Sequence, residues 1–109
     1  MRAFNFDPAA VIALDRILHE PARLCVTACL AQLEEADFVF LQSQTGMTVG
    51  NLSSHARKLE AAGYITIHKE FQDNRPRTTL RLTAEGRKAF DGYTAAMRTI
   101  LAAFTTGNG

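Results

Sequence analysis

Apolar side chains recur at helical spacing through the first third of the chain and predict two helices. The first opens at Asp7-Pro8, because aspartate is a favourable helix N-cap and proline suits the first turn. It ends at Glu20-Pro21, since a residue before proline avoids helical backbone angles. The second helix spans residues 21–33. The apolar positions that define them are Val11, Leu14, Ile17 and Leu18 in the first helix, and Ala22, Val26, Cys29, Leu30 and Leu33 in the second.

The next segment predicts two further helices joined by a tight turn. Residues 34–37 form a polar connector, and residues 38–41 are expected to begin extended before the chain turns helical. Gly46 ends this short third helix, and Thr48 is a good N-cap for a fourth, which a glycine at position 63 closes. One face of the fourth helix is apolar and is expected to face the core. It consists of Leu52, Ala56 and Leu59.

The period of the pattern then changes from 3.6 to 2, which predicts a β-hairpin. Residues 72–77 are polar and form the expected turn, and residues 78–82 form the second strand. Arg75 and Arg77 flank Pro76, so the hairpin is expected to carry a basic tip. The side chains expected to face the core are Ile65, Ile67, Phe71, Leu80 and Leu82.

A long final helix starts after Thr83, its predicted N-cap, with Glu85 in the first turn. An apolar seam follows, with spacings of three and four residues. A narrow seam of this kind suits the pairing of two helices, and we expect it at a dimer interface. Packing on the first helix of the same chain is the alternative, and both can hold at once. The seam consists of Phe90, Tyr93, Met97, Ile100 and Phe104.

Together these elements predict a mainly α fold of the α+β class, a winged helix-turn-helix with a β-hairpin wing and a long C-terminal helix. A length of 109 residues suits one domain. We expect it to occupy residues 1–109, with its core at about 8–105 and a frayed tail at 105–109.

The charge is distributed unevenly along the chain. The formal net charge is only +1. Residues 1–47 carry three Lys/Arg and six Asp/Glu, whereas residues 48–88 carry eight and four. A local basic surface on a nearly neutral chain favours a polyanionic partner, although a solvated charged face gives the same count.

The cysteine count and the lengths of apolar runs indicate where in the cell the protein is expected. Two cysteines cannot form a disulfide framework, which favours a reducing cytoplasm. The longest wholly apolar run has seven residues, from Pro8 to Leu14, against the roughly 20 that a membrane span needs. The amino terminus lacks a signal-peptide pattern. We therefore expect a cytoplasmic protein that does not bind a membrane.

The face of the fourth helix opposite its apolar side is small, polar or basic. A face of this kind fits a DNA major groove, because small residues allow close approach and Asn, Ser and Arg reach base edges. An ordinary solvated helix face is the alternative. The hairpin that follows adds Lys69 and Arg81 on its arms, which places positive charge beside this helix. The residues of the face are Gly50, Asn51, Ser54, Arg57, Lys58 and Ala61.

Two motifs resemble a known family. Residues 45–65, TGMTVGNLSSHARKLEAAGYI, are similar to the recognition-helix segment of small winged-helix transcriptional regulators related to the arsenic-repressor and multiple-antibiotic-resistance-regulator groups. Residues 74–86, NRPRTTLRLTAEG, resemble their wing and the entry to their last helix. The resemblance implies a homodimer on a near-palindromic operator, with the helix from Thr48 as recognition helix and residues 70–79 as the wing. In regulators of this kind the first and last helices often supply the dimer interface, so the resemblance implies the same here.

These observations predict a sequence-specific, DNA-binding transcriptional regulator that acts as a homodimer on double-stranded DNA. A winged-helix module that binds another protein and has no operator is the alternative. A small-molecule effector would have to bind at the dimer interface or between helices, because the chain has no further domain for it. The expected DNA contacts are Thr48, Asn51, Ser54, His55, Arg57, Lys58, Lys69, Arg75 and Arg77.

Metal and catalytic chemistry find little support in the sequence. Cys25 and Cys29 lie one helical turn apart near His19, but no other close-spaced ligand completes a zinc site, and buried structural cysteines are common. A disulfide within one helical turn has poor geometry. The chain has no phosphate-binding glycine loop, nucleophile elbow or metal-binding helix motif. We therefore expect no cofactor, no metal and no catalytic residue.

Overall fold

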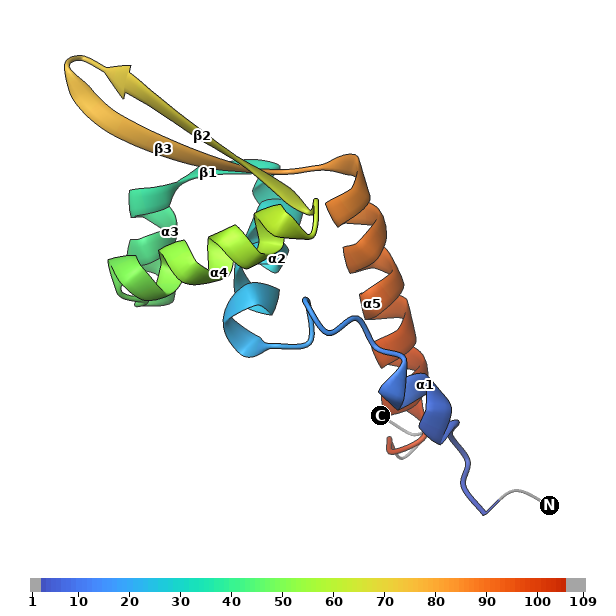
Figure 1. Cartoon of the computed structure of the whole chain (residues 1–109). Coiled ribbons are helices and arrows are strands. Elements are labelled where there is room, and N and C mark those ends of the chain that lie inside the picture. Colours follow the sequence, from blue (N-terminus) through green and yellow to red (C-terminus); the bar gives the residue numbers. More distant parts are fainter. Residues whose placement is uncertain (1–2, 106–109) are drawn as a thin grey trace.

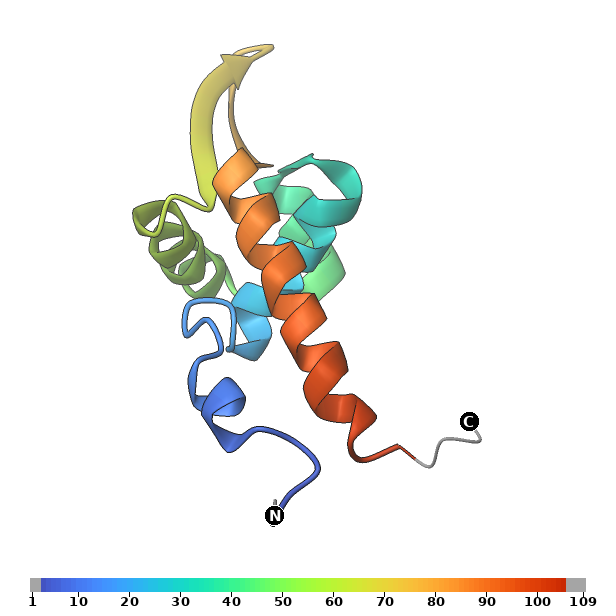
Figure 2. The same ribbon diagram turned by 90° about the vertical axis from the view of Figure 1, so that its right-hand side faces the viewer.

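The computed structural model describes residues 3–105 and confirms the predicted winged-helix fold. Figures 1 and 2 show a group of helices, a hairpin that projects beyond them, and a long helix α5 on the other side of the molecule. The three strands form one antiparallel sheet in the order β1-β3-β2. In chain order the elements are α1 (Pro8–Ile12), α2 (Pro21–Leu33), β1 (Glu35–Asp37), α3 (Phe38–Thr45), α4 (Val49–Ala61), β2 (Ile65–Gln72), β3 (Arg75–Leu82) and α5 (Ala84–Ala102).

The core lies where α2, α3 and α4 meet the base of the sheet. Most of its side chains are aliphatic and closely packed, which fixes the orientation of α4 relative to the hairpin. The predicted inward face of the fourth helix is confirmed, since Leu52, Ala56 and Leu59 are all buried. The fully enclosed aliphatic residues elsewhere in the core are Leu18, Val26, Leu30, Leu41 and Leu80.

The predicted helix boundaries around the helix-turn-helix are also confirmed. Gly46 ends α3 at a φ of 73°, a left-handed conformation that favours glycine. The Thr48 hydroxyl then accepts the Asn51 N–H at 3.1 Å and caps α4. Thr83 caps α5 in the same way, through the Gly86 N–H at 2.9 Å. These local signals place α4 and α5 where the sequence pattern predicts them.

The first helix is much shorter than predicted. It ends at Ile12, and the chain continues through turns to Glu20. The Asp15 carboxylate accepts the N–H groups of Ile17 at 2.8 Å and Leu18 at 3.1 Å. A short polar side chain that bonds to nearby backbone in this way competes with a helix. The apolar stripe still reaches the core, because Leu18 is fully buried, but it does so from irregular backbone.

Residues 35–37 form a strand where the sequence suggested a connector. β1 pairs with β3, with Ala36 opposite Leu80 and Asp37 opposite Thr79. The predicted extended start at Phe38 is wrong, since α3 begins at that residue. A three-residue strand is too short to show alternation, so the sequence alone carries no signal for it.

The turn of the hairpin is shorter than predicted. It consists of Asp73 and Asn74, both with positive φ (54° and 63°), as in the two-residue turns that suit a twisted hairpin. Arg75 therefore pairs with Gln72 on the strands, and the following proline and arginine lie on β3 rather than at a basic tip. Phe71, predicted to face the core, is 78% exposed because the hairpin extends past the core.

The seam on α5 divides between the core and the surface. Tyr93 and Ile100 are buried within the chain, whereas Phe104 is 66% exposed. Within residues 3–105 no helix is long and apolar enough to cross a membrane. The part of the predicted frayed tail at residues 106–109 lies outside the described residues.

Candidate nucleic-acid interface

Helix α4 presents a continuous exposed face on the side away from the core. Asn51, Ser54, Arg57 and Lys58 are exposed, and Thr48 is exposed at the N-terminus of the helix. Gly50 lies on the same face, and a side chain at this position would have open space around it. This surface is narrow, polar and basic, and it can approach another molecule closely.

His55 differs from the rest of the predicted contact set. Its side chain is only 17% exposed and faces α2. The ring Nδ1 lies 3.1 Å from Nη1 of Arg23 and 3.3 Å from Oε2 of Glu20. His55 therefore ties α4 to the start of α2 and is less accessible to a partner than the other expected DNA contacts.

The carboxylate of Glu20 anchors this junction. Its side chain also accepts the N–H groups of Ala22 and Arg23 at the start of α2. Burial raises the pKa of this carboxyl, but the two N–H groups and the charges of His55 and Arg23 outweigh it, so the pKa lies below its usual value. The carboxylate thus remains charged where it holds α2 and α4 together.

The hairpin has two faces because strand side chains alternate. On the face toward α4, Lys69 and Thr78 line a groove of about 200 Å³ together with Ser53 and Arg57 of α4. Two predicted DNA contacts from different elements, Arg57 and Lys69, thus line one groove. The fold therefore brings positive charge from the wing and from the helix to the same side.

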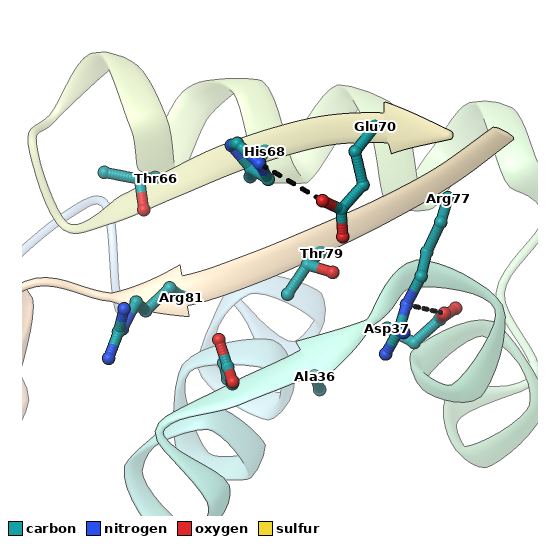
Figure 3. A pocket seen from close by; sticks show the side chains of 9 residues that line it. Ala36, Asp37, Thr66, His68, Glu70, Arg77, Thr79 and Arg81 are labelled. Atoms are coloured by element: carbon teal, nitrogen blue, oxygen red, sulfur yellow. Dashed lines mark ion pairs between the residues drawn. The ribbon is translucent and has the colours of Figure 1, made fainter. Parts of the chain in front are cut away.

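The outer face of the sheet carries charges of both signs, as Figure 3 shows. Nε of Arg77 lies 3.0 Å from Oδ2 of Asp37, which comes from β1. His68 Nε2 lies 3.6 Å from Oε2 of Glu70 on the same strand. These side chains line a depression of about 600 Å³ together with others of both charges. Arg77 therefore has an acidic partner and lies on the opposite face from Lys69.

Sequence reasoning missed two residues that shape this surface. Asp37 pairs with Arg77 and caps α3 through the Val39 N–H at 2.7 Å. Its position directly before an apolar helix was a capping signal. Phe71, which was expected to face the core, lies on the same side of the wing as Lys69, because residues two apart on a strand point the same way.

Helix α5 and helix α2 line an open apolar groove of about 740 Å³. Phe90 and Met97 of the predicted dimer seam are half-buried in it, beside Leu24 and Ala28 of α2. Tyr93 is also part of the lining, and its hydroxyl lies 2.8 Å from Nδ1 of His19. The seam therefore contributes both to the core and to an uncovered apolar surface.

The two cysteines lie on α2, with Cys25 exposed and Cys29 half-buried. Burial, followed by the nearby Cys25 thiol, raises the pKa of the Cys29 thiol, so it is held in the protonated form. The Nδ1 atom of His19 is hydrogen-bonded to the hydroxyl of Tyr93. In residues 3–105 no three His, Cys, Asp or Glu side chains are grouped closely enough to hold a metal ion.

Comparison with known proteins agrees with this architecture. A family model described as winged helix DNA-binding domain matches residues 22–101. An uncharacterized protein of Methanocaldococcus jannaschii is 33% identical over 78 residues, which are 72% of this chain and 85% of that protein.

Solved structures with the same fold include one from Pyrococcus horikoshii and one from Bacillus subtilis. A transcriptional regulator homologue from Pyrococcus horikoshii has a TM-score of 0.83 and 28% identity, and the match covers 88% of this chain and 97% of that chain. YusO from Bacillus subtilis has a TM-score of 0.75 and 22% identity, over 91% of this chain and 70% of that one. The chain therefore belongs to the winged helix DNA-binding domain family, among transcriptional regulators of the kind that its two sequence motifs resemble.

Proposed function

We propose that this protein is a sequence-specific, DNA-binding transcriptional regulator of the cytoplasm, which acts as a homodimer. Helix α4 enters the major groove, and the wing contacts the backbone or the minor groove. The observation that carries the proposal is the convergence of Arg57 from α4 and Lys69 from β2 on one groove, beside an exposed polar helix face.

Each exposed residue of α4 has a distinct role in this proposal. Asn51, Ser54 and Arg57 contact base edges or the phosphates next to them. Thr48 caps the helix by accepting the Asn51 N–H, and the exposed N-terminus of α4 faces a phosphate in the proposed complex. Lys58 neutralises a phosphate.

The wing contributes fewer free charges than its sequence suggests. Lys69 is exposed on the side of α4, and Arg75 is exposed beside the turn. Both neutralise phosphates in the proposed complex. Arg77 contacts DNA only if it leaves Asp37, so we assign it a smaller share of the affinity.

The homodimer would be formed through α5 and the elements beside it. Phe90 and Met97 line the open apolar groove, and Leu101 and Phe104 are exposed at the end of the helix. A second copy that covers this surface removes it from water, which favours association. Two copies then present two α4 helices to successive major grooves, about 34 Å apart.

The test is a salt series of binding to a random-sequence duplex, with the oligomeric state measured in parallel. If Arg57, Lys58, Lys69 and Arg75 each neutralise one phosphate, the log–log salt slope is about −3.6 for one protomer and about −7 for a dimer. Absence of binding at low salt refutes the proposal and favours the protein-interaction alternative.

Two variants separate the proposed roles. Arg75→Ala should weaken binding to all sequences and reduce the salt slope by about one for each bound protomer, which is about two for the dimer. Arg57→Ala should in addition relax sequence preference, at a cost of about 1–3 kcal/mol on the preferred site. An unchanged slope for Arg75→Ala would show that the wing does not contact DNA, and a uniform loss for Arg57→Ala would make that residue a phosphate contact.

A further inference from the structure

The side of the wing that faces α4 carries three cross-strand pairs between the core and the turn. Ile67 pairs with Leu80, which is fully buried. Lys69 pairs with Thr78, and both line the groove shared with α4. The third pair, Phe71 and Pro76, continues this row toward the turn. Alternation therefore places an aromatic ring and a proline ring on the same side as the proposed recognition helix.

This third pair is exposed although it is apolar. Phe71 is 78% exposed, and Pro76 is exposed beside it. The pair lies one register step from the end of the paired strands, which close on the two-residue turn after Gln72. The core therefore does not account for the choice of two rings at this position.

The surroundings of the pair are suited to a polyanion. Lys69 precedes Phe71 by two residues on the same face, and Arg75 adjoins Pro76 in the chain. Arg57 lines the groove on the same side. On the outer face Arg77 is paired with Asp37, and alternation places Arg75 on that face as well, so Lys69 and Arg57 are the cations on the side of the two rings. A flat apolar ring flanked by cations fits a partly opened base step whose phosphates need neutralising.

We propose that Phe71, supported by Pro76, is a wedge that inserts between two base pairs in the minor groove and kinks the duplex. The proposal rests on the proposed function, since it assumes that α4 binds the adjacent major groove. Proline stiffens the strand behind the wedge, and the rigid phenyl ring loses little conformational freedom when it inserts. The wedge adds preference for flexible pyrimidine–purine steps, which unstack most easily.

The experiment measures DNA bending by the full-length chain. The probe is a duplex of about 30 base pairs that contains TA steps and carries a donor and an acceptor fluorophore at its two ends. Energy transfer and affinity are measured at saturation for the wild type, Phe71→Ala and Phe71→Leu. The control is Leu33→Ala, which shortens another exposed apolar side chain, 49% exposed at the end of α2. Circular dichroism checks that each variant is folded, which is expected because position 71 lies outside the core.

The wild type and Leu33→Ala should raise the transfer efficiency when they bind. Phe71→Ala should still bind, about tenfold more weakly, and leave the duplex straight, because loss of one base–ring stacking contact has that order of effect. Phe71→Leu, which keeps an apolar wedge, should retain most of the bend. Equal bending by Phe71→Ala and the wild type, or binding by the wild type without bending, overturns the wedge and leaves the proposed function intact. If the wild type does not bind the duplex at all, the proposed function and the wedge both fail.

Discussion

The close packing of α5 against the base of the wing requires a glycine at position 86. Gly86, in the first turn of α5, is buried against the end of the α4–β2 connection. A Cβ at this position would lie 2.1 Å from the Tyr64 carbonyl oxygen and 2.8 Å from Cδ1 of Leu82. That carbonyl also accepts the Thr83 N–H at 3.0 Å, so it is held in place. Gly86→Ala must therefore push α5 away from the base of the hairpin.

The loss in free energy of unfolding caused by Gly86→Ala can be estimated from the atoms that the added methyl group would meet. Overpacking a well-filled site costs about 1–3 kcal/mol. The nearest obstruction at Gly86 is the Tyr64 backbone carbonyl, which cannot rotate away as a side chain can, so we expect the upper end, about 3 kcal/mol, which is a large share of the roughly 5–15 kcal/mol of a typical domain. Gly92 is the matched control on the same helix, because a Cβ there meets no atom within 4 Å. Gly92→Ala should stabilise by about 1 kcal/mol through helix propensity.

Urea unfolding followed by circular dichroism measures both variants under the same conditions. We expect the midpoint to fall for Gly86→Ala and to rise for Gly92→Ala, with similar m-values. In thermal melts Gly86→Ala should lower the midpoint by roughly 10–20 °C. Substitutions at unconstrained surface sites usually change the free energy of unfolding by less than about 0.5 kcal/mol. A change that small for Gly86→Ala would show that α5 is not held against Tyr64.

Three further variants test the interface and its supports. Gly50→Ala should stabilise α4 by about 0.5 kcal/mol yet lower duplex affinity several-fold, because it adds a methyl group to the proposed contact face; equal affinity would remove Gly50 from that face. Asp37→Asn keeps the cap of α3 but frees Arg77, so the salt slope of duplex binding should steepen by about one for each bound protomer, and an unchanged slope would mean that Arg77 does not reach DNA. The hydrogen bond to Asp15, followed by burial, raises the pKa of Tyr64 to about 12. The protonated phenol therefore contributes stability that is complete below about pH 10 and is lost as pH rises toward about 12. The stability difference between wild type and Tyr64→Phe in urea unfolding should shrink over that range, and a constant difference would refute the linkage.

Much of the fold could be predicted because its signals are local. Thr48 and Thr83 are capping residues whose hydroxyls accept a backbone N–H three residues later, and Gly46 supplies the left-handed conformation that ends α3. The buried face of α4 follows from spacing alone, since residues three and four apart share one side of a helix. These interactions need no knowledge of the rest of the chain.

The errors arise where distant segments decide the structure. Asp15 ends the helical stripe by bonding to its own backbone and to the hydroxyl of Tyr64, which lies 49 residues away. Residues 35–37 become a strand because β3 offers a free edge. His55 is drawn toward Glu20 and Arg23 of another helix. In each case the partner is set by packing, and no local pattern encodes it.

Charge counted along the sequence overstates the charge that a partner can meet. Of the basic residues between positions 48 and 88, Arg77 is paired with Asp37, and Arg87 donates to the Ala31 carbonyl at 2.9 Å. Arg81 lies opposite Glu35 in the register of β1 and β3. The short strand β1 thus supplies acidic side chains to the outer face of the wing and leaves the α4 side more positive by comparison. A three-residue strand without a sequence signal therefore contributes to the charge difference between the two faces of the wing, on which the proposed DNA contact depends.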